Sequence, residues 1–401
     1  MLEALSLEIR AVGIDRTRVQ ATVARAGLTT GALYSRWQAL EELMVGLWAE
    51  RLAPRLKSLF EAALAATTDP DGAAARRLEA SLEAASRCIE DDVLADFLLA
   101  SRRFQDLKRA MSVEISGWLD VPRAGGFKRE TMVAILGAVT GQLIHGGFSR
   151  EKSFAWARLF ADLAAASHSP RKFRVLNLRP VPLGTIERVS EDPARLRLIT
   201  AAAAVIARSG MDGATVSRIG RLAGVDGTVL YRRYAGVEEL LLDALRAHVA
   251  LNVEADVKVI SDAYAREESA EVTAAVAIAA LGSPEREQWR ELHYESLLAA
   301  RVRPEIGDDV RERFDGRLAN LRRAGSRKSR VAARHPARDQ VRFYQTLTLG
   351  TGVLIHCVGL QVRQMPALQR TFAHVFDAAR KRVLAVGPPP RIGPGLARPK
   401  P

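Results

Sequence analysis

Apolar residues recur every three to four positions along much of the chain, which is the spacing of amphipathic α-helices. The stretch 196–207 is a clear example, and its apolar face is made of Leu198, Ile199, Ala202, Val205 and Ile206. The segments Met132–Ile144 and Phe343–Leu360 are apolar almost all round, as is typical of buried helices. Because the apolar residues are mostly Ala, Leu and Val and only 6% of residues are aromatic, helices are favoured over strands. We therefore predict an all-α protein.

A repeat divides the chain into two similar halves. Four motifs reappear 197 residues later without a gap: Gly13-Ile14-Asp15 as Gly210-Met211-Asp212, Ala26-Gly27-Leu28 as Ala223-Gly224-Val225, Leu33-Tyr34 as Leu230-Tyr231, and Glu41-Glu42-Leu43 as Glu238-Glu239-Leu240. Farther along, Leu143-Ile144-His145 corresponds to Leu354-Ile355-His356 at an offset of 211. The longer offset fits an insertion in the second half, for which the basic stretch 322–338 is the candidate. The repeat predicts two copies of one domain.

The segment 215–234 has the features of a helix-turn-helix. Gly210 is suited to end the helix before it, and Thr215 and Asp226 are suited to cap a second and a third helix. Gly224 permits the sharp turn between these two helices. In a helix-turn-helix, the second helix of the pair enters the major groove of DNA. The segment therefore predicts a DNA-binding unit.

The side chains around these helices suit a contact with DNA. Helix N-termini attract phosphate, hydroxyls bond phosphate oxygens, and Arg neutralises the backbone or reads guanine. In the first copy the expected DNA-binding residues are Arg18, Gln20, Thr29, Thr30, Gly31, Tyr34, Ser35 and Arg36. In the second copy they are Thr215, Ser217, Arg218, Asp226, Gly227, Thr228, Tyr231, Arg232 and Arg233. The formal net charge of +13 also favours a polyanionic partner, here double-stranded DNA.

Both copies resemble the DNA-binding segment of the tetracycline-repressor (TetR) family. The second copy carries Thr215-Val216, Ala223-Gly224-Val225-Asp226, Leu230-Tyr231, Tyr234 and Glu238-Glu239-Leu240. The first copy carries Val19, Ala26-Gly27-Leu28-Thr29, Gly31, Leu33-Tyr34, Trp37 and Glu41-Glu42-Leu43. Family members usually have a phosphate-binding Lys where this chain has Leu40 and Val237, and the first copy has Thr22-Val23 for the usual Ile-Ala. The first helix of the first copy is also clipped by Met1.

The resemblance implies two tandem TetR-like units. Each unit would have an N-terminal three-helix DNA-binding domain and a C-terminal helical domain for ligand binding and dimerisation. We expect DNA-binding domains at 1–46 and 194–243, regulatory domains at 47–168 and 244–386, a linker at 169–193, and a disordered tail at 387–401. The Pro-rich composition of the linker breaks helices, and its length lets it span about 80 Å when extended.

In the family, the last two helices of each unit pair with those of a partner to form a four-helix bundle. Here the candidates are Lys128–Gly146 with Ser153–Ala166, and Asp339–Gln361 with Pro366–Val383. Gly137, Gly141, Gly350 and Gly352 would allow these helices to approach closely. We therefore expect the two halves to dimerise with each other as an intramolecular pseudo-dimer, and association between chains is left open.

The expected function is that of a ligand-responsive repressor of transcription. Its operator would be asymmetric, because Thr29, Thr30 and Ser35 stand where the second copy has Asp226, Gly227 and Arg232. Candidate ligand-binding residues for a small-molecule effector are Trp118, His145, Trp289, His293, Tyr344 and His356. Two alternatives stay open: a DNA-binding protein without an effector, and a small-molecule-binding protein whose first DNA-binding module is degenerate.

Several other classes of protein have no support in the sequence. Cys88 and Cys357 are too far apart to suggest a metal site or a disulfide framework, and no nucleophile elbow or Gly-rich phosphate loop is found. We therefore expect no catalytic residues, no cofactor and no metal. Met1–Gly13 lacks the apolar run of a secretion signal, and Leu347–Leu360 is too short to cross a membrane. A cytoplasmic protein without a membrane partner is expected.

Overall fold

The described part of the structure is entirely helical. The computed structural model describes residues 1–68, 73–85, 88–121, 126–146, 148, 156–169, 171–178, 186, 189–248, 251, 269–312 and 338–385, and contains no strand in these ranges. The prediction of an all-α protein is therefore confirmed for the described residues. The predicted tail at 387–401 and the basic stretch 322–338, apart from its last residue, lie outside them.

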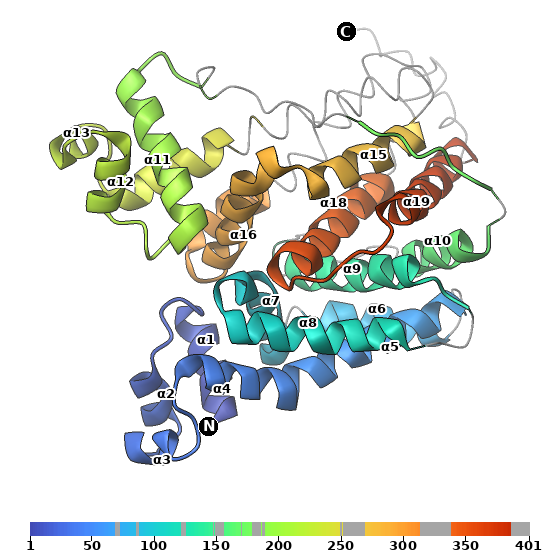
Figure 1. Cartoon of the computed structure of the whole chain (residues 1–401), viewed down its shortest axis with the longest axis horizontal. Helices are drawn as coiled ribbons and strands as arrows, with labels where there is room; N and C mark the ends of the chain where they lie inside the picture. Colours follow the sequence, from blue (N-terminus) through green and yellow to red (C-terminus); the bar gives the residue numbers. More distant parts are fainter. Residues whose placement is uncertain are drawn as a thin grey trace, which may run out of the picture.

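The first half begins with four short helices and continues into longer ones. These are α1 (Leu2–Val12), α2 (Val19–Arg25), α3 (Thr30–Tyr34), α4 (Leu40–Leu47), the π-helical turn η1 (Trp48–Leu52), α5 (Ala53–Thr68), α6 (Ala73–Ala85), α7 (Ile89–Ala100), the 3₁₀ turn η2 (Ser101–Arg103), α8 (Gln105–Asp120), α9 (Arg129–Gly146) and α10 (Trp156–His168). The first four helices form a cluster at one end of the molecule, and the longer helices extend away from it (Figure 1).

The second half follows the same order. Its elements are α11 (Pro193–Ser209), α12 (Val216–Ala223), α13 (Gly227–Tyr231), a helix at 237–248, α15 (Ser269–Gly282), the 3₁₀ turn η4 (Pro284–Arg286), α16 (Glu287–Val302), a helix at 304–312, α18 (Arg338–Gly352), the π-helical turn η5 (Val353–Cys357) and α19 (Met365–Ala385). The cluster formed by α11, α12 and α13 lies at the same end of the molecule as the cluster formed by α1 to α4 (Figure 1). The two helix-turn-helix segments therefore lie at the same end of the molecule (Figure 1).

Helices α9 and α18 pack against each other more closely than ordinary side chains would allow. A Cβ atom built on Gly350 would overlap the backbone carbonyl oxygen of Gly137. A Cβ on Gly141 would lie 2.9 Å from the carbonyl carbon of Thr346. Helices α10 and α19 pack beside this pair, so that α9, α10, α18 and α19 form one bundle. The predicted close approach at Gly137, Gly141 and Gly350 is confirmed, whereas the hypothetical Cβ of Gly352 meets side chains of its own half, chiefly the Tyr294 hydroxyl at 2.8 Å.

The described part of the linker is held against the second half. Residues 171–178 form no regular element, and Nε2 of Gln369 on α19 donates a hydrogen bond of 3.0 Å to the carbonyl oxygen of Leu176. Arg171 forms an ion pair of 2.7 Å with Asp377, also on α19. Residues 171–178 therefore lie against α19 at the surface of the bundle.

Candidate nucleic-acid interface

Side chains cap the first three helices of the second helix-turn-helix unit, residues 194–243, which we call the second head. Asp192 caps α11 by accepting hydrogen bonds from two backbone N–H groups, the nearer being that of Ala194 at 2.9 Å. Thr215 caps α12 and Asp226 caps α13, where the Asp226 carboxylate accepts from the backbone N–H of Thr228 at 2.9 Å. Gly224 has φ 64°, the left-handed conformation that glycine adopts readily, at the turn between them. The predicted caps and turn are confirmed, and they hold α13 away from the body of the protein.

Helix α13 is shorter than the sequence suggests. A third helix from Gly227 to Tyr234 is expected from the motif, but α13 ends at Tyr231. Tyr234 turns inward instead, is only 6% exposed, and donates a hydrogen bond of 2.7 Å from its hydroxyl to Asp243. The same carboxylate pairs with Arg195 at 2.6 Å. This buried contact fixes the base of the second head and leaves Tyr231 at its tip.

The first helix-turn-helix unit, residues 1–46, which we call the first head, has fewer caps. Its first helix has 11 residues, compared with 17 in α11, and neither α1 nor α2 has a side-chain cap. Thr29 takes the place of Asp226, and its hydroxyl accepts a hydrogen bond of 3.2 Å from the backbone N–H of Ala32. Gly27 has φ 65° and makes the turn between α2 and α3. The first head therefore has the same order of helices and the same turn as the second head, but fewer side-chain caps.

The predicted DNA-binding residues lie on the surface in both heads. In the first head all eight are exposed, and in the second head all nine are exposed except Gly227, which is half-buried. Tyr34 and Tyr231, which correspond at the offset of 197, are 53% and 61% exposed. The two tyrosines therefore occupy equivalent exposed positions on the two heads.

The charges of the two heads differ. The first head has five basic and five acidic residues, whereas the second has seven basic and five acidic. Arg233 is bound to Asp192 at 2.8 Å, and the guanidinium of Arg36 lies over the Trp37 ring at 4.8 Å. Arg232 is exposed and has no partner among the described residues. At the positions where the family usually has a Lys, Leu40 and Val237 pack partly buried against the core. Arg232 is thus an exposed guanidinium beside Tyr231 on the second head.

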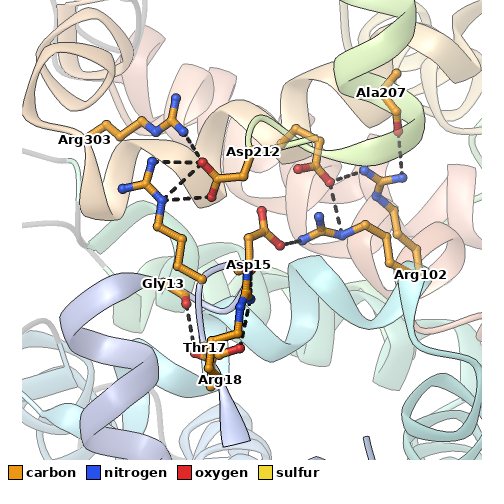
Figure 2. Close-up of polar contacts among 11 residues, drawn as sticks. Gly13, Asp15, Thr17, Arg18, Arg102, Ala207, Asp212 and Arg303 are labelled. Carbon is orange, nitrogen blue, oxygen red and sulfur yellow. Dashed lines mark hydrogen bonds and ion pairs between the residues drawn. The ribbon is translucent and has the colours of Figure 1, made fainter. Parts of the chain in front are cut away.

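A network of ion pairs joins the two heads to each other and to the body (Figure 2). Arg16 of the first head binds Asp212 of the second, with Nη2 2.9 Å from Oδ1 and Nε 3.1 Å from Oδ2. Arg303 also binds Asp212. Burial works against the charged form of Asp212, but the hydrogen bond from Arg16 and the charge of Arg303 hold its pKa below the ordinary value. On the other side of the network, Arg103 pairs with Asp15 at 2.5 Å.

The deeper part of the network lies between α7 with η2 and α16, and its carboxyls Asp96 and Glu295 are buried. Arg102 of the first half pairs with Glu295 and, at 3.7 Å, with Glu291 of the second half. Arg301 of the second half pairs with Asp92 of the first half at 2.6 Å and with Asp96 at 2.7 Å. Each residue of the first set corresponds to one of the second at an offset of 199. These four ion pairs all join the two halves.

Burial raises the pKa of two of these carboxyls, Asp96 and Glu295, to about 7 in each case, against the lowering effect of the nearby arginines. A raised pKa means that the folded protein holds the proton more tightly than the unfolded chain, so protonation stabilises the fold. This contribution is complete below the ordinary carboxyl pKa and is lost as the pH rises through about 7.

We therefore expect the free energy of unfolding to fall between about pH 5 and pH 8, by on the order of 2–3 kcal/mol for each carboxyl. Denaturant titrations at several pH values measure this slope. The variant Glu295→Gln should lose about half of it, whereas Glu287→Gln, an exposed carboxyl on the same helix, should keep it. An unchanged slope in Glu295→Gln would contradict the assignment.

Four of the six predicted ligand-binding residues line one cavity. His145, Trp289, His293 and Tyr344 come together between α9, α15, α16 and α18. Trp118 does not belong to this cavity and is buried in α8 at 7% exposure. Arg290, Gln345 and Thr348 also line it, and the sequence pattern does not predict this.

His356 does not line the cavity either. Its Nε2 lies 2.7 Å from the carbonyl oxygen of Leu281, and burial lowers the pKa of this histidine to about 4. The imidazole is therefore neutral near pH 7 and is occupied by a backbone contact. This contact explains why His356 and His145, which correspond in sequence, differ in position relative to the cavity.

The comparisons with known proteins point to the second head. Residues 198–244 match the family model described as bacterial regulatory proteins of the tetR family. The matched segment begins within α11 and ends within the helix at 237–248, so it covers the whole helix-turn-helix of this head. The match supports a DNA-binding transcriptional regulator of the TetR family, whose members are generally regulators rather than enzymes. No curated protein matches the chain.

No helix among the described residues is long and apolar enough to cross a membrane. In the same part of the chain, no group of three or more His, Cys, Asp or Glu side chains is arranged to hold a metal ion.

Proposed function

We propose that this protein is a ligand-responsive repressor in which both halves of one chain form a pseudo-dimer that reads an asymmetric operator. The observation that carries the proposal is the pair of helix-turn-helix segments at one end of the molecule, with Tyr34 and Tyr231 exposed at matching positions. Two recognition helices presented together are what a regulator needs to contact two half-sites on one face of DNA.

The pseudo-dimer is supported by contacts that repeat in both directions. In a two-fold interface, if one residue contacts another, their counterparts also contact each other. Arg102 with Glu295, and Arg301 with Asp96, satisfy this rule at the offset of 199. Gly13 and Gly210 correspond as well: the hypothetical Cβ of Gly13 lies 3.2 Å from Val302, and that of Gly210 meets Arg103, the counterpart of Val302.

The asymmetric operator is supported by the chemistry of the two recognition helices. The caps are Thr29 and Asp226, and the exposed residues after the tyrosines are Ser35 and Arg232. A symmetric dimer mirrors a palindromic site, whereas unlike helices favour unlike half-sites. Because the two halves are joined in one chain, the order of the half-sites is also fixed.

Selection of binding sites from random DNA by the full chain tests the proposal. We expect a site with two different half-sites about one helical turn apart, bound by one chain. Measuring the mass of the complex in parallel gives the number of chains. A palindromic site bound by two chains would contradict the pseudo-dimer, and the absence of any selected sequence would contradict the function.

A further inference from the structure

The cavity between α15, α16 and α18 has polar groups that lack a partner. Its volume is about 70 Å³, and it lies next to His145 of α9. Three buried atoms lining it form no hydrogen bond within the described part of the protein: Trp289 Nε1, Gln345 Nε2 and Thr348 Oγ1. Buried polar atoms are rarely left in this state, because each costs about 1–3 kcal/mol. All three can donate a hydrogen bond, so the cavity is suited to a ligand that accepts them.

The charged groups around the cavity determine whether it favours an anionic or a cationic ligand. Arg290 lines it, is 8% exposed, and donates from Nη1 to the backbone carbonyl oxygens of Ala280 at 3.1 Å and Ser283 at 2.6 Å. These partners are neutral, and burial lowers the pKa of Arg290. No Asp or Glu is among the described residues that line the cavity. A cationic ligand would find no counter-charge there, whereas an anion would meet Arg290 and three unsatisfied donors.

The walls of the cavity select the shape of the ligand. The rings of Trp289 and His293 are stacked, with centroids 5.3 Å apart and planes 11° from parallel. Tyr294 and Tyr344 also line the cavity, together with apolar side chains such as Leu349. Aromatic walls favour a flat ring by stacking or edge contacts. The space has room for little more than one small ring system.

We propose that this cavity binds a small aromatic carboxylate whose anionic group accepts hydrogen bonds from the unsatisfied donors beside Arg290. The inference names the effector class of the regulator proposed above, and it depends on that function only for its regulatory consequence. Helix α16 carries both Arg290 and, about one turn farther along, Glu295 of the ion-pair network between the halves. A ligand bound in the cavity can therefore affect the ion-pair network, and through it the heads, by way of this one helix.

Among the described residues, the site is present in the second half and has no counterpart in the first. At offsets of 199 and 211, the counterparts of Arg290, Gln345 and Thr348 are Asp91, Ala134 and Gly137. Asp91 carries the opposite charge and is engaged by Arg55 through two hydrogen bonds of 2.8 Å. Ala134 and Gly137 supply no side-chain donor. An anion that binds in the second half therefore has no equivalent site in the first half.

Isothermal titration of the full chain tests the inference. The probes are benzoate, 4-hydroxybenzoate and indole-3-carboxylate, each compared with its neutral amide, and benzamidinium serves as the cationic probe. We expect at least one carboxylate to bind with one site per chain, and its amide and benzamidinium to bind at least tenfold more weakly. No binding by any carboxylate, equal binding of the amide, or two sites per chain would overturn the inference.

Variants locate the binding within the cavity. Arg290→Gln should weaken the carboxylate by about tenfold or more, since a hydrogen bond to a charged group is lost with the positive charge. Arg290 also holds two backbone carbonyls, so Gln345→Met and Thr348→Val, which keep the volume and remove donors, provide the same test without disturbing them. At least one of these two should weaken binding about tenfold, and Gln288→Ala, an exposed position on α16, should not. Unchanged affinity in both would overturn the inference.

The outcomes for this site and for the proposed function are separate. A chain that binds DNA but none of the carboxylates would contradict only the ligand class. A chain that binds a carboxylate at this cavity but selects no DNA would contradict only the regulator. If both bind, DNA release at saturating carboxylate measures the coupling between them.

Discussion

Replacing Gly350 by alanine is expected to destabilise the protein by more than about 3 kcal/mol, because the added methyl group has no space. Its Cβ would overlap the backbone carbonyl oxygen of Gly137, and backbone atoms of α9 cannot move aside as a flexible side chain would. Helices α9 and α18 would have to separate, which exposes the apolar faces of the central bundle. Thermal and denaturant unfolding of the purified variant measure the loss.

A matched control is available on α8. Gly117 also lies within a helix, but a Cβ built there meets no atom within 4 Å. Gly117→Ala should therefore stabilise the protein by up to about 1 kcal/mol, because alanine favours the helix. If Gly350→Ala and Gly117→Ala had the same effect, α9 and α18 would not approach as closely as described. Because α9 belongs to the first half and α18 to the second, Gly350→Ala also tests whether DNA binding requires the halves to be joined.

Local features of the fold could be predicted from the sequence. The caps Thr215 and Asp226 and the turn at Gly224 depend on residues only a few positions apart, so their chemistry is visible in the sequence itself. The bundle helices were predicted at 128–146 and 339–361, and the structure has α9 at Arg129–Gly146 and α18 with η5 at Arg338–Cys357. Their continuous apolar character made them recognisable.

The ion-pair network could not be predicted, because its partners are far apart in the chain. Asp96 and Glu295 are ordinary polar positions in the pattern of their helices, and nothing in that pattern shows that they are 4% and 0% exposed. Burial of a charge is possible there only because Arg301 and Arg102 approach from the other half. The one feature of the sequence that relates the two carboxyls is their offset of 199. This offset indicates equivalent ion pairs only once the two halves are known to be in contact.

The cavity was predicted in part for a similar reason. Aromatic and histidine residues such as Trp289 and His145 are uncommon in this chain and stand out as candidates. Arg290, Gln345 and Thr348 do not stand out, because polar residues at these spacings on a helix commonly face solvent. Their role follows from the packing of α16 against α18, which encloses them.

The substitution Arg232→Glu is expected to weaken operator binding by about 100-fold or more at low salt. Arg232 is exposed beside Tyr231 on the second head and has no partner within the described residues, so it is available to a phosphate. Glutamate at this position would face the DNA backbone with like charge, which costs several kcal/mol. The milder Arg232→Gln should reduce the slope of log K against log salt by about 1, the value for one phosphate contact. Fluorescence anisotropy with the selected site measures both quantities, and Gln288→Glu controls for the single unit of charge that Arg232→Gln removes.

The same substitution at the matching position decides whether the first head contacts DNA. Ser35 is the counterpart of Arg232 at the offset of 197 and is also exposed. If both heads bind one asymmetric site, Ser35→Glu should weaken binding about tenfold or more, and only the half-site read by the first head should lose its protection from cleavage. If Ser35→Glu bound as tightly as Gln288→Glu, the first head would be degenerate and the second alone would hold the DNA. Helices α1 and α2 have no side-chain caps, so the first head depends more than the second on contacts outside it. These contacts are the ion pairs of Arg16 with Asp212 and of Asp15 with Arg103, and they must order the first head before it can bind DNA.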